Sequence, residues 1–229
     1  MHALRSWKNR LTCSITYATS LIRNLPTNWA KIPFFYKEKT VNIEPDAVLC
    51  VIDMQNDFFT GGPLAVPGAE RIIPVINRIA RIFSTVLTSQ CWHPVDMGKH
   101  FNEYGSHCVK NSEGAKLHPD LSLYNAITIY KGTGTNGHGL SLFDGKSAED
   151  TSVVVELYKH KCKALYFCGL ITEICIAEGA LDALLLGFET HVIVDACAAL
   201  NAEDEKCALI ALRQAGAKLV SSTELLRPN

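Results

Sequence analysis

Short apolar runs alternate with helix-length amphipathic segments along most of this 229-residue chain, and the alternation limits the folds it can adopt. The runs, typical of buried parallel strands, are Ala47–Ile52, Thr85–Ser89, Ala126–Tyr130, Ala164–Cys168, His191–Asp195 and Lys218–Ser221. The segments with helical spacing are Ala69–Phe83, Ser147–His160, Thr172–Leu186 and Ala202–Ala215. This order predicts an α/β protein, a three-layer α/β/α sandwich with a mostly parallel, Rossmann-like central sheet.

The pattern runs without an internal repeat, a low-complexity tract or a linker after Asp46, so residues 45–229 are predicted to form one domain. One stretch, Gln90–Asn125, is long and polar and lies between the second and third predicted strands. Connections of this length are uncommon in compact domains unless they serve a function. We therefore expect this stretch to contribute to a functional site.

Residues 1–44 differ from the rest of the chain in charge. The basic residues up to position 37 are Arg5, Lys8, Arg10, Arg23, Lys31 and Lys37, and no acidic residue precedes Glu38. An acid-free segment with Arg, Ser and Thr is typical of a mitochondrial or plastid transit peptide. We predict an N-terminal extension outside the folded domain and a mitochondrial or other organellar location, with the cytoplasm as the alternative. The competing interpretation is a retained arm that packs against a neighbour through Trp29 and Phe34–Tyr36.

Composition narrows the class of partner. Lys and Arg total 22 against 23 Asp and Glu, a formal charge of -1, so the chain as a whole lacks the basic field that attracts nucleic acid or acidic lipid. No run approaches the roughly twenty apolar residues of a membrane span. The nine cysteines include no CxxC pair, which favours a reduced intracellular protein. A small-molecule ligand is the expected partner, and assembly into a homo-oligomer is left open.

Polar and reactive side chains follow four of the predicted strands. Asp53 follows the first, Cys91 and His93 the second, Lys131 the third, and Cys175 the fourth. The carboxyl ends of parallel strands form one edge of a sheet, where ligands bind. A Cys that opens a helix can be a nucleophile, an acid beside it can take its proton, and a Lys can hold that acid ionised. Taken singly, the Cys is better explained by core packing and the Lys by a solvated strand end. The hypothesis of a nucleophilic site therefore rests on Asp, Lys and Cys all occurring at strand ends.

Several motifs at these positions occur in family order. Ile52-Asp53-Met54-Gln55-Asn56-Asp57-Phe58 resembles the first-strand motif of the isochorismatase-like cysteine hydrolases, and Gly169-Leu170-Ile171-Thr172-Glu173-Ile174-Cys175 resembles their nucleophile turn. Trp92-His93-Pro94, and His107-Cys108-Val109 with Gly114-Ala115, resemble the nicotinamidase branch. The resemblance covers the chain from about Ala47 to the C-terminus.

The resemblance implies a catalytic triad of Asp53, Lys131 and Cys175 that hydrolyses a carboxamide through a cysteine thioester. It also implies an oxyanion site formed by backbone N–H groups at Ile171 and Cys175, and a cis peptide bond just before Ile171. For the nicotinamidase branch, the reaction is conversion of nicotinamide to nicotinate and ammonia in NAD salvage (pyridine nucleotide biosynthesis). The expected partner is thus a small-molecule amide substrate.

The resemblance also implies a divalent metal, and here the sequence departs from the family pattern. The implied ligand positions are 91, 93 and 107, which hold Cys91, His93 and His107, where the family has an Asp at the first. A thiolate with two imidazoles suits zinc better than manganese or magnesium. We therefore expect a bound Zn²⁺, with loss of the metal site as the competing interpretation. His100 and His118 are interpreted as ordinary polar loop residues.

The substrate pocket also departs from the family pattern. Ile171 replaces an Ala, and the usual Trp-Pro before the loop histidine reads Tyr104-Gly105-Ser106. Phe58 and Tyr104 could form an aromatic wall for a pyridinecarboxamide, or could simply pack in the core and at the rim. Nicotinamide hydrolysis is the leading hypothesis. The alternatives are hydrolysis of another small amide, such as a carbamoyl compound, and a non-catalytic paralogue with an altered metal site.

Overall fold

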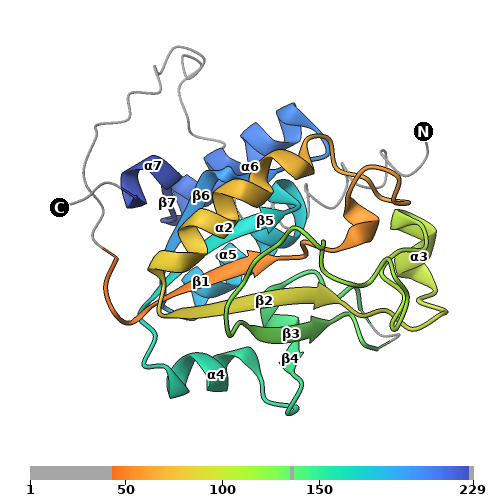
Figure 1. Ribbon diagram of the computed structural model, residues 1–229, viewed down its shortest axis with the longest axis horizontal. Helices are drawn as coiled ribbons and strands as arrows, with labels where there is room; N and C mark the ends of the chain where they lie inside the picture. The colour runs from red at the N-terminus through yellow and green to blue at the C-terminus, as the bar shows by residue number, and fades with distance from the viewer. Residues whose placement is uncertain (1–42, 135–136, 227–229) are drawn as a thin grey trace. The chain divides into compact units, whose positions relative to one another are not determined.

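In the computed structural model, which describes residues 43–134 and 137–226, the strands form one seven-stranded sheet (Figure 1). In chain order they are β1 Ala47–Ile52, β2 Thr85–Cys91, β3 Ile127–Lys131, β4 Lys146–Ser147, β5 Ala164–Leu170, β6 Glu189–Ala198 and β7 Lys218–Val220. Their spatial order is β4-β3-β2-β1-β5-β6-β7. All neighbours pair in parallel except β3 and β4, which are antiparallel. The mostly parallel sheet of the predicted fold is confirmed.

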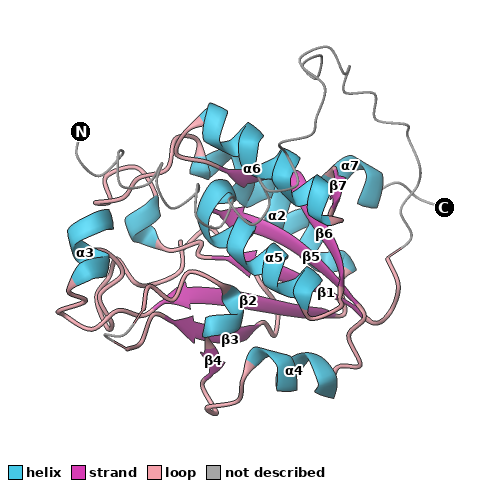
Figure 2. Ribbon diagram, turned by 180° about the vertical axis from the view of Figure 1, so that it is seen from behind, coloured by secondary structure: helices cyan, strands magenta, loops and turns pink. Residues whose placement is uncertain are grey.

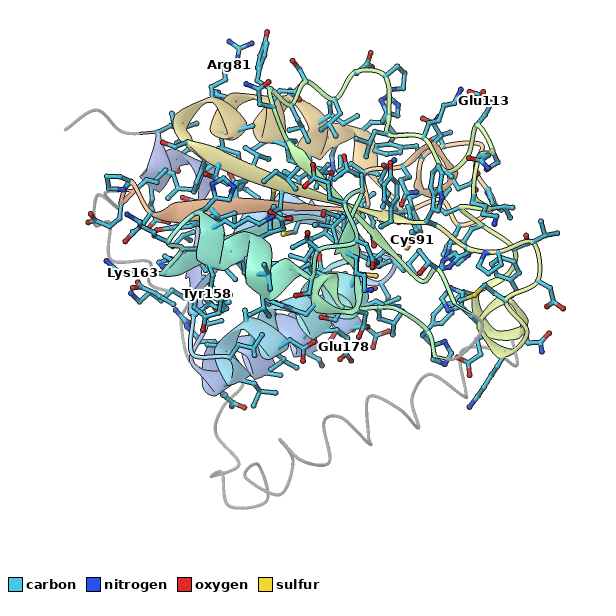
Figure 3. The ribbon with its side chains drawn as sticks, turned by 90° about the horizontal axis from the view of Figure 1, so that it is seen from below. Arg81, Cys91, Glu113, Tyr158, Lys163 and Glu178 are labelled. Atoms are coloured by element: carbon cyan, nitrogen blue, oxygen red, sulfur yellow. The ribbon has the colours of Figure 1, made fainter. Side chains whose placement is uncertain are left out.

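Helices cover both faces of this sheet. They are α2 Ile73–Ile79, α3 Lys99–Tyr104, α4 Val153–Lys159, α5 Ala177–Leu185, α6 Ala202–Ala215 and α7 Ser222–Leu225. Helices α2 and α7 contact each other and β6, while α5 contacts α6 on the opposite face. Figure 3 views the sheet nearly edge-on, with Arg81, just after α2, on one side and Tyr158 and Glu178, on α4 and α5, on the other. Figure 2 shows α5 in front of the strands and α4 below them.

The two central strands explain why the core lies where it does. Every residue of β1 and of β5 is buried, so both strands read as continuous apolar runs rather than alternating ones. From β1 the chain proceeds through β2 and β3 on one side, then crosses to β5 and continues outward on the other side. The carboxyl ends of β1 and β5 therefore form the switch point of the sheet, which is where an open α/β sheet binds its ligands.

Gly169 lets these two strands approach closely at that edge. Its φ of 109° lies in the region that favours glycine, and a Cβ there would collide with the backbone carbonyl of Ile52. Just beyond it the chain passes through a cis peptide bond between Leu170 and Ile171, as the family resemblance implied. The nucleophile turn is thus fixed directly against the end of β1.

Some elements differ from the sequence expectations. Within the predicted helix Ala69–Phe83, only Ile73–Ile79 is α-helical. It is flanked by short 3-10 helices at Ala69–Ile72 and Ala80–Ile82. The predicted helix Thr172–Leu186 begins with one π-helical turn, Thr172–Ile176. The short elements α3, α7 and β4 were not predicted, because segments of two to six residues carry too little periodicity to be recognised.

Positions 1–42 of the predicted extension lie outside the described residues. Among the described residues, no helix is long and apolar enough to cross a membrane. The eight cysteines in this part of the chain are all free.

Candidate active site

Three of the predicted site residues meet at the carboxyl edge of the sheet. Asp53 follows β1, Lys131 ends β3, and Cys175 lies in the π-helical turn after β5. Lys131 Nζ is 2.8 Å from Asp53 Oδ2 and 3.4 Å from Cys175 Sγ. All three side chains are at least 95% buried. A carboxylate, an ammonium group and a thiol therefore form one cluster shielded from bulk water.

Lys131 is not a solvated strand-end lysine but a fully buried cation. It also donates a hydrogen bond to the Gly139 carbonyl at 3.2 Å. Burial alone would lower its pKa, yet the facing Asp53 carboxylate and the two cysteine sulfurs hold the pKa well above the ordinary value. An ammonium group in this position stays charged and compensates a negative charge on its neighbours.

Ser89, on β2, orients the Asp53 carboxylate. The Ser89 hydroxyl donates to Asp53 Oδ1 at 2.7 Å, and the Asp53 backbone N–H donates to Ser89 at 3.2 Å. With Oδ1 held by Ser89 and Oδ2 by Lys131, both carboxylate oxygens have defined partners. Ser89 did not stand out in the sequence because it lies inside a strand run and belongs to no motif.

The Cys175 thiol differs from the expectation for a cysteine at a helix N-terminus. Burial raises its pKa well above the ordinary value, the Asp53 charge raises it further, and Lys131 partly opposes both effects. The resting residue is therefore a thiol rather than a thiolate. A base is required to take its proton, and Asp53 is in a position to do so.

A second cluster lies beside the first. One ligand atom each of Cys91, His93 and His107 lie within 4.8 Å of one another, and all three residues are buried. Cys91 is the last residue of β2, and the two histidines lie in the long loop that follows it. The three side chains expected from the family resemblance are thus brought together.

Backbone carbonyls orient both histidines. His93 Nδ1 is 3.0 Å from the Gly132 carbonyl oxygen, and His107 Nδ1 is 2.9 Å from that of Gly105. Each carbonyl accepts the Nδ1 proton, so each Nε2 carries the lone pair that binds a metal. His93 Nε2 is buried without a hydrogen-bond partner among the described residues. Burial also lowers the pKa of His93 to about 4, which keeps the ring neutral.

Cys91 joins the two clusters. Its sulfur lies 3.2 Å from Lys131 Nζ and 3.6 Å from Asp53 Oδ2. Burial and the Asp53 charge raise the pKa of Cys91 to about 12, while Lys131 lowers it. Figure 3 shows Cys91 where the strand ends meet the long loop. A thiol that is costly to ionise unaided, next to two neutral imidazoles, fits a soft divalent cation that binds as the thiol loses its proton.

Two residues of the first-strand motif hold the long loop over this edge. Gln55 Nε2 donates to the carbonyls of Cys91 and Ala115, both at 2.8 Å, and Gln55 Oε1 accepts from the Cys91 N–H at 2.8 Å. Asp57 Oδ2 accepts from the Cys108 N–H at 2.7 Å. The sequence motif contained both residues, but their role depends on contacts across the fold that spacing alone does not indicate.

The two aromatic candidates lie near the histidines. Phe58 is buried, with its ring centroid 5.5 Å from that of His107. Tyr104 is half-buried at the end of α3, and its ring centroid lies 4.9 Å from that of His100.

The interpretation of His100 as an ordinary polar loop residue was wrong: it is 3% exposed, because α3 folds it inward against His93 and His107. His118 packs its ring on Phe59, at 4.3 Å.

Glu173 lies in the nucleophile turn, two residues before Cys175. Its Oε1 accepts the backbone N–H groups of Leu200 and Asn201 at 2.9 and 3.2 Å, and its Oε2 is buried without a partner among the described residues. Burial raises the pKa of Glu173 to about 7. The folded protein therefore retains a proton that the unfolded chain releases at lower pH.

The free energy of unfolding is expected to fall as the pH rises from about 5 to about 7, since the folded state binds the extra proton in that interval. In Glu173→Gln the side-chain carbonyl can still accept both backbone hydrogen bonds, but it cannot ionise. This variant should lose the part of the pH dependence that Glu173 contributes. Urea unfolding of the wild-type protein and the variant at pH 5 and pH 7.5 measures this difference in the free energy of unfolding. Equal pH-dependent changes in the two proteins would contradict the proposed role of Glu173.

The fold and this edge of the sheet define a class of protein. The family model described as "Isochorismatase domain" matches residues 47–224, so the chain belongs to the isochorismatase family of hydrolases.

Within that family, the chain is similar to nicotinamidases. It is 34% identical to the Escherichia coli (strain K12) protein named "Nicotinamidase" over 201 residues, which cover 76% of this chain and 94% of the other. The Pyrococcus horikoshii pyrazinamidase, solved in complex with zinc, is 35% identical with a TM-score of 0.70, covering 77% of this chain and 99% of the other. An L. infantum protein solved with nicotinate is 28% identical with a TM-score of 0.74, covering 82% and 99%. The resemblance to the nicotinamidase branch is confirmed.

Proposed function

We propose that this protein hydrolyses nicotinamide to nicotinate and ammonia, a reaction of NAD salvage. The observation that carries the proposal is the buried Asp53–Lys131–Cys175 cluster, with the Cys/His cluster directly beside it. The similar nicotinamidases support the choice of substrate. A buried thiol, a carboxylate and an ammonium group in contact are the elements of nucleophilic catalysis on a carboxamide.

The first half of the reaction forms a thioester. Asp53 takes the proton of the Cys175 thiol, and the sulfur attacks the amide carbon. The resulting oxyanion accepts hydrogen bonds from the backbone N–H groups of Ile171 and Cys175. Asp53 then returns the proton to the amide nitrogen, the carbon–nitrogen bond breaks, and ammonia leaves while Cys175 carries the acyl group.

The second half releases the acid. Asp53 accepts a proton from a water molecule, whose oxygen attacks the thioester carbon. The carbon–sulfur bond breaks, and the proton returns to the Cys175 sulfur. Lys131 faces the Asp53 carboxylate at 2.8 Å, so its positive charge compensates the negative charge of that carboxylate in this buried site.

We further propose that Cys91, His93 and His107 hold a divalent cation, and that this cation is zinc. When bound, such an ion supplies Lewis-acid chemistry and an attachment point for a pyridine nitrogen. The donor set supports zinc, because thiolate and imidazole ligands favour it over magnesium. In this proposal Phe58 and Tyr104 flank the pyridine ring of the substrate.

Residues 1–44 are proposed to lie outside a catalytic domain of residues 45–229, supported by the family match that begins at residue 47. The role of the extension as a transit peptide, the organellar location and the absence of a nucleic-acid partner stay predictions from composition. Assembly into a homo-oligomer also stays a prediction.

The proposed function is tested on protein treated with a chelator. We expect the treated protein to release little ammonia from nicotinamide, and one equivalent of zinc to restore turnover more fully than magnesium does. The measurement is enzyme-coupled ammonia detection with metal analysis of the same samples, and a panel that includes a carbamoyl compound serves as the comparison. If only the carbamoyl compound were hydrolysed, it and not nicotinamide would be the substrate. If no amide were hydrolysed, the hypothesis of a non-catalytic paralogue would be favoured.

A further inference from the structure

The π-helical turn Thr172–Ile176, which carries Cys175, has an unusual backbone. The Ile171 carbonyl accepts the N–H groups of Ile174 and Ile176, at 3.1 and 3.2 Å, which are the residues on either side of the proposed nucleophile. Turns of this kind are rare and occur mostly as single turns within α-helices, often at functional sites. The shape of this π turn therefore depends on contacts with the surrounding fold.

The Glu173 side chain connects the π turn to the segment that precedes α6. Its Oε1 accepts the backbone N–H groups of Leu200 and Asn201, at 2.9 and 3.2 Å, and the residue is 3% exposed. Hydrogen bonds shielded from water in this way are electrostatically stronger than exposed ones. Two donors on one oxygen also define where the carboxyl group lies. Glu173 is thus held at a fixed position relative to the start of α6.

The segment that binds this carboxyl group is itself well held. The Asn201 side chain caps α6 by accepting two backbone N–H groups of its first turn, and a cap of this kind stabilises a helix by about 1 kcal/mol. Thr172, which is fully buried, adds a second link, because its hydroxyl donates to Glu205 Oε1 at 3.3 Å. Two consecutive residues of the π turn are therefore attached to the beginning of α6.

The Glu173 side chain is costly to bury. Its Oε2 has no hydrogen-bond partner within residues 43–134 and 137–226, and an unsatisfied buried oxygen costs about 1–3 kcal/mol. Native proteins leave few such atoms, and each of them requires an explanation. Since Asn201 already caps α6, the stability of that helix does not explain a buried acid here. The position of Glu173, two residues before Cys175, points to a role in the site.

We propose that Glu173 is a positioning residue: by anchoring the π turn, it keeps the Cys175 sulfur and backbone N–H group aligned with the substrate amide. The inference rests on the proposed function, but it adds a residue to which that function assigns no role. In the anchored turn, the Cys175 sulfur lies 3.4 Å from Lys131 Nζ. A displacement of roughly 1 Å at a reacting atom can cost about 100-fold in rate. Phe58 and Tyr104, proposed to flank the substrate ring, lie on other elements, so the loss should fall on kcat rather than on KM.

The experiment compares two substitutions that nearly preserve the volume of the side chain. Glu173→Met removes the acceptor, and we expect kcat for nicotinamide to fall about tenfold or more while KM changes less than about threefold. Glu173→Gln retains a carbonyl oxygen for both backbone N–H groups and should keep kcat within about threefold of the wild-type value. Steady-state ammonia release measures both constants on samples of equal metal content. Glu173→Ala, which also lacks the acceptor, decides the question if the Met variant does not fold.

Glu224→Met is the matched control, because it removes another buried acid that accepts a backbone hydrogen bond. Glu224 is 8% exposed on α7, and its Oε2 accepts the Ser221 N–H at 2.6 Å. α7 follows the edge strand β7, away from the strands that carry the two clusters. We expect this variant to lose stability, as Glu173→Met does, but to keep its kcat. Chemical denaturation of each variant measures the free energy of unfolding.

The outcomes separate this inference from the proposed function. If wild-type protein hydrolyses nicotinamide and a folded Glu173→Met or Glu173→Ala variant keeps kcat within about threefold, the inference is overturned and the proposed function stands. An equal loss of kcat in Glu173→Gln or in Glu224→Met would also overturn it, since the loss would then not come from the two hydrogen bonds. If only another amide is hydrolysed, the same comparison is made on that amide. If the wild-type protein hydrolyses no amide, both the inference and the proposed function are overturned.

Discussion

Cys175→Ala is expected to lower kcat/KM for nicotinamide by at least about 10,000-fold, because the variant cannot form the acyl-enzyme bond. The effect should be on chemistry rather than on folding, since the change removes one sulfur atom from a side chain that does not hold the sheet together. Ammonia release at high enzyme concentration measures the residual rate. Mass spectrometry of the wild-type protein quenched during turnover should show one added acyl group on Cys175.

Cys207→Ala is the matched control for this variant. Cys207 is an exposed cysteine on α6, outside the two clusters at the strand ends, so its removal should leave turnover unchanged. If Cys175→Ala instead kept a tenth or more of the wild-type rate, the covalent mechanism would be wrong. The substrate would then have to be attacked by water or by another cysteine, for which Cys91 is the nearest candidate at the Lys131 ammonium group.

Lys131→Met is expected to destabilise the protein by about 3–5 kcal/mol, because it leaves the buried Asp53 carboxylate without its cation. Lys131 Nζ is also within hydrogen-bond distance of Cys91 Sγ, Cys175 Sγ and the Gly139 carbonyl. Turnover should be lost as well, since the variant removes the cation that contacts both Asp53 and Cys175. Chemical denaturation and ammonia release measure the two effects separately.

The double variant Lys131→Met/Asp53→Asn separates stability from catalysis. With both charges removed, no uncompensated charge remains buried, so much of the lost stability should return while turnover stays absent. Asn retains an oxygen that can accept the Ser89 hydroxyl, which preserves that contact. If the double variant were as unstable as Lys131→Met alone, the destabilisation would come from the missing lysine side chain rather than from the unpaired carboxylate.

Much of the sheet could be predicted because its central strands are buried on both faces. The predicted bounds of the first strand, Ala47–Ile52, agree with the structure, since every residue in it is apolar and buried. β6 is longer than the apolar segment His191–Asp195, because pairing with β5 extends it to Glu189–Ala198. α3 lies in a polar loop that is held over the sheet by Gln55 and Asp57, and hydrogen bonds between distant segments leave no periodic signal.

The candidate site could likewise be predicted only in part from the sequence. Asp53, Lys131 and Cys175 were indicated by their positions at strand ends, which parallel pairing brings to one edge. The depth of Lys131 could not be read from the sequence, because its burial depends on Gly139 and on Cys91 from a neighbouring strand. His100 was misinterpreted for a related reason: its local sequence is polar, and only the fold turns it toward the other histidines.

The two contacts of Cys91 have a consequence for how such a protein can evolve. Its sulfur belongs to the Cys/His cluster and also lies within 3.2 Å of Lys131 Nζ and 3.6 Å of Asp53 Oδ2. An exchange between thiol and carboxylate at position 91 alters the charge beside the proposed base as well as the hardness of the ligand set. A substitution at position 91 that suits a different metal would therefore also change the charge next to Asp53 and Lys131. In the proposed function, a substitution at position 91 would therefore alter metal preference and catalytic rate together, through one atom.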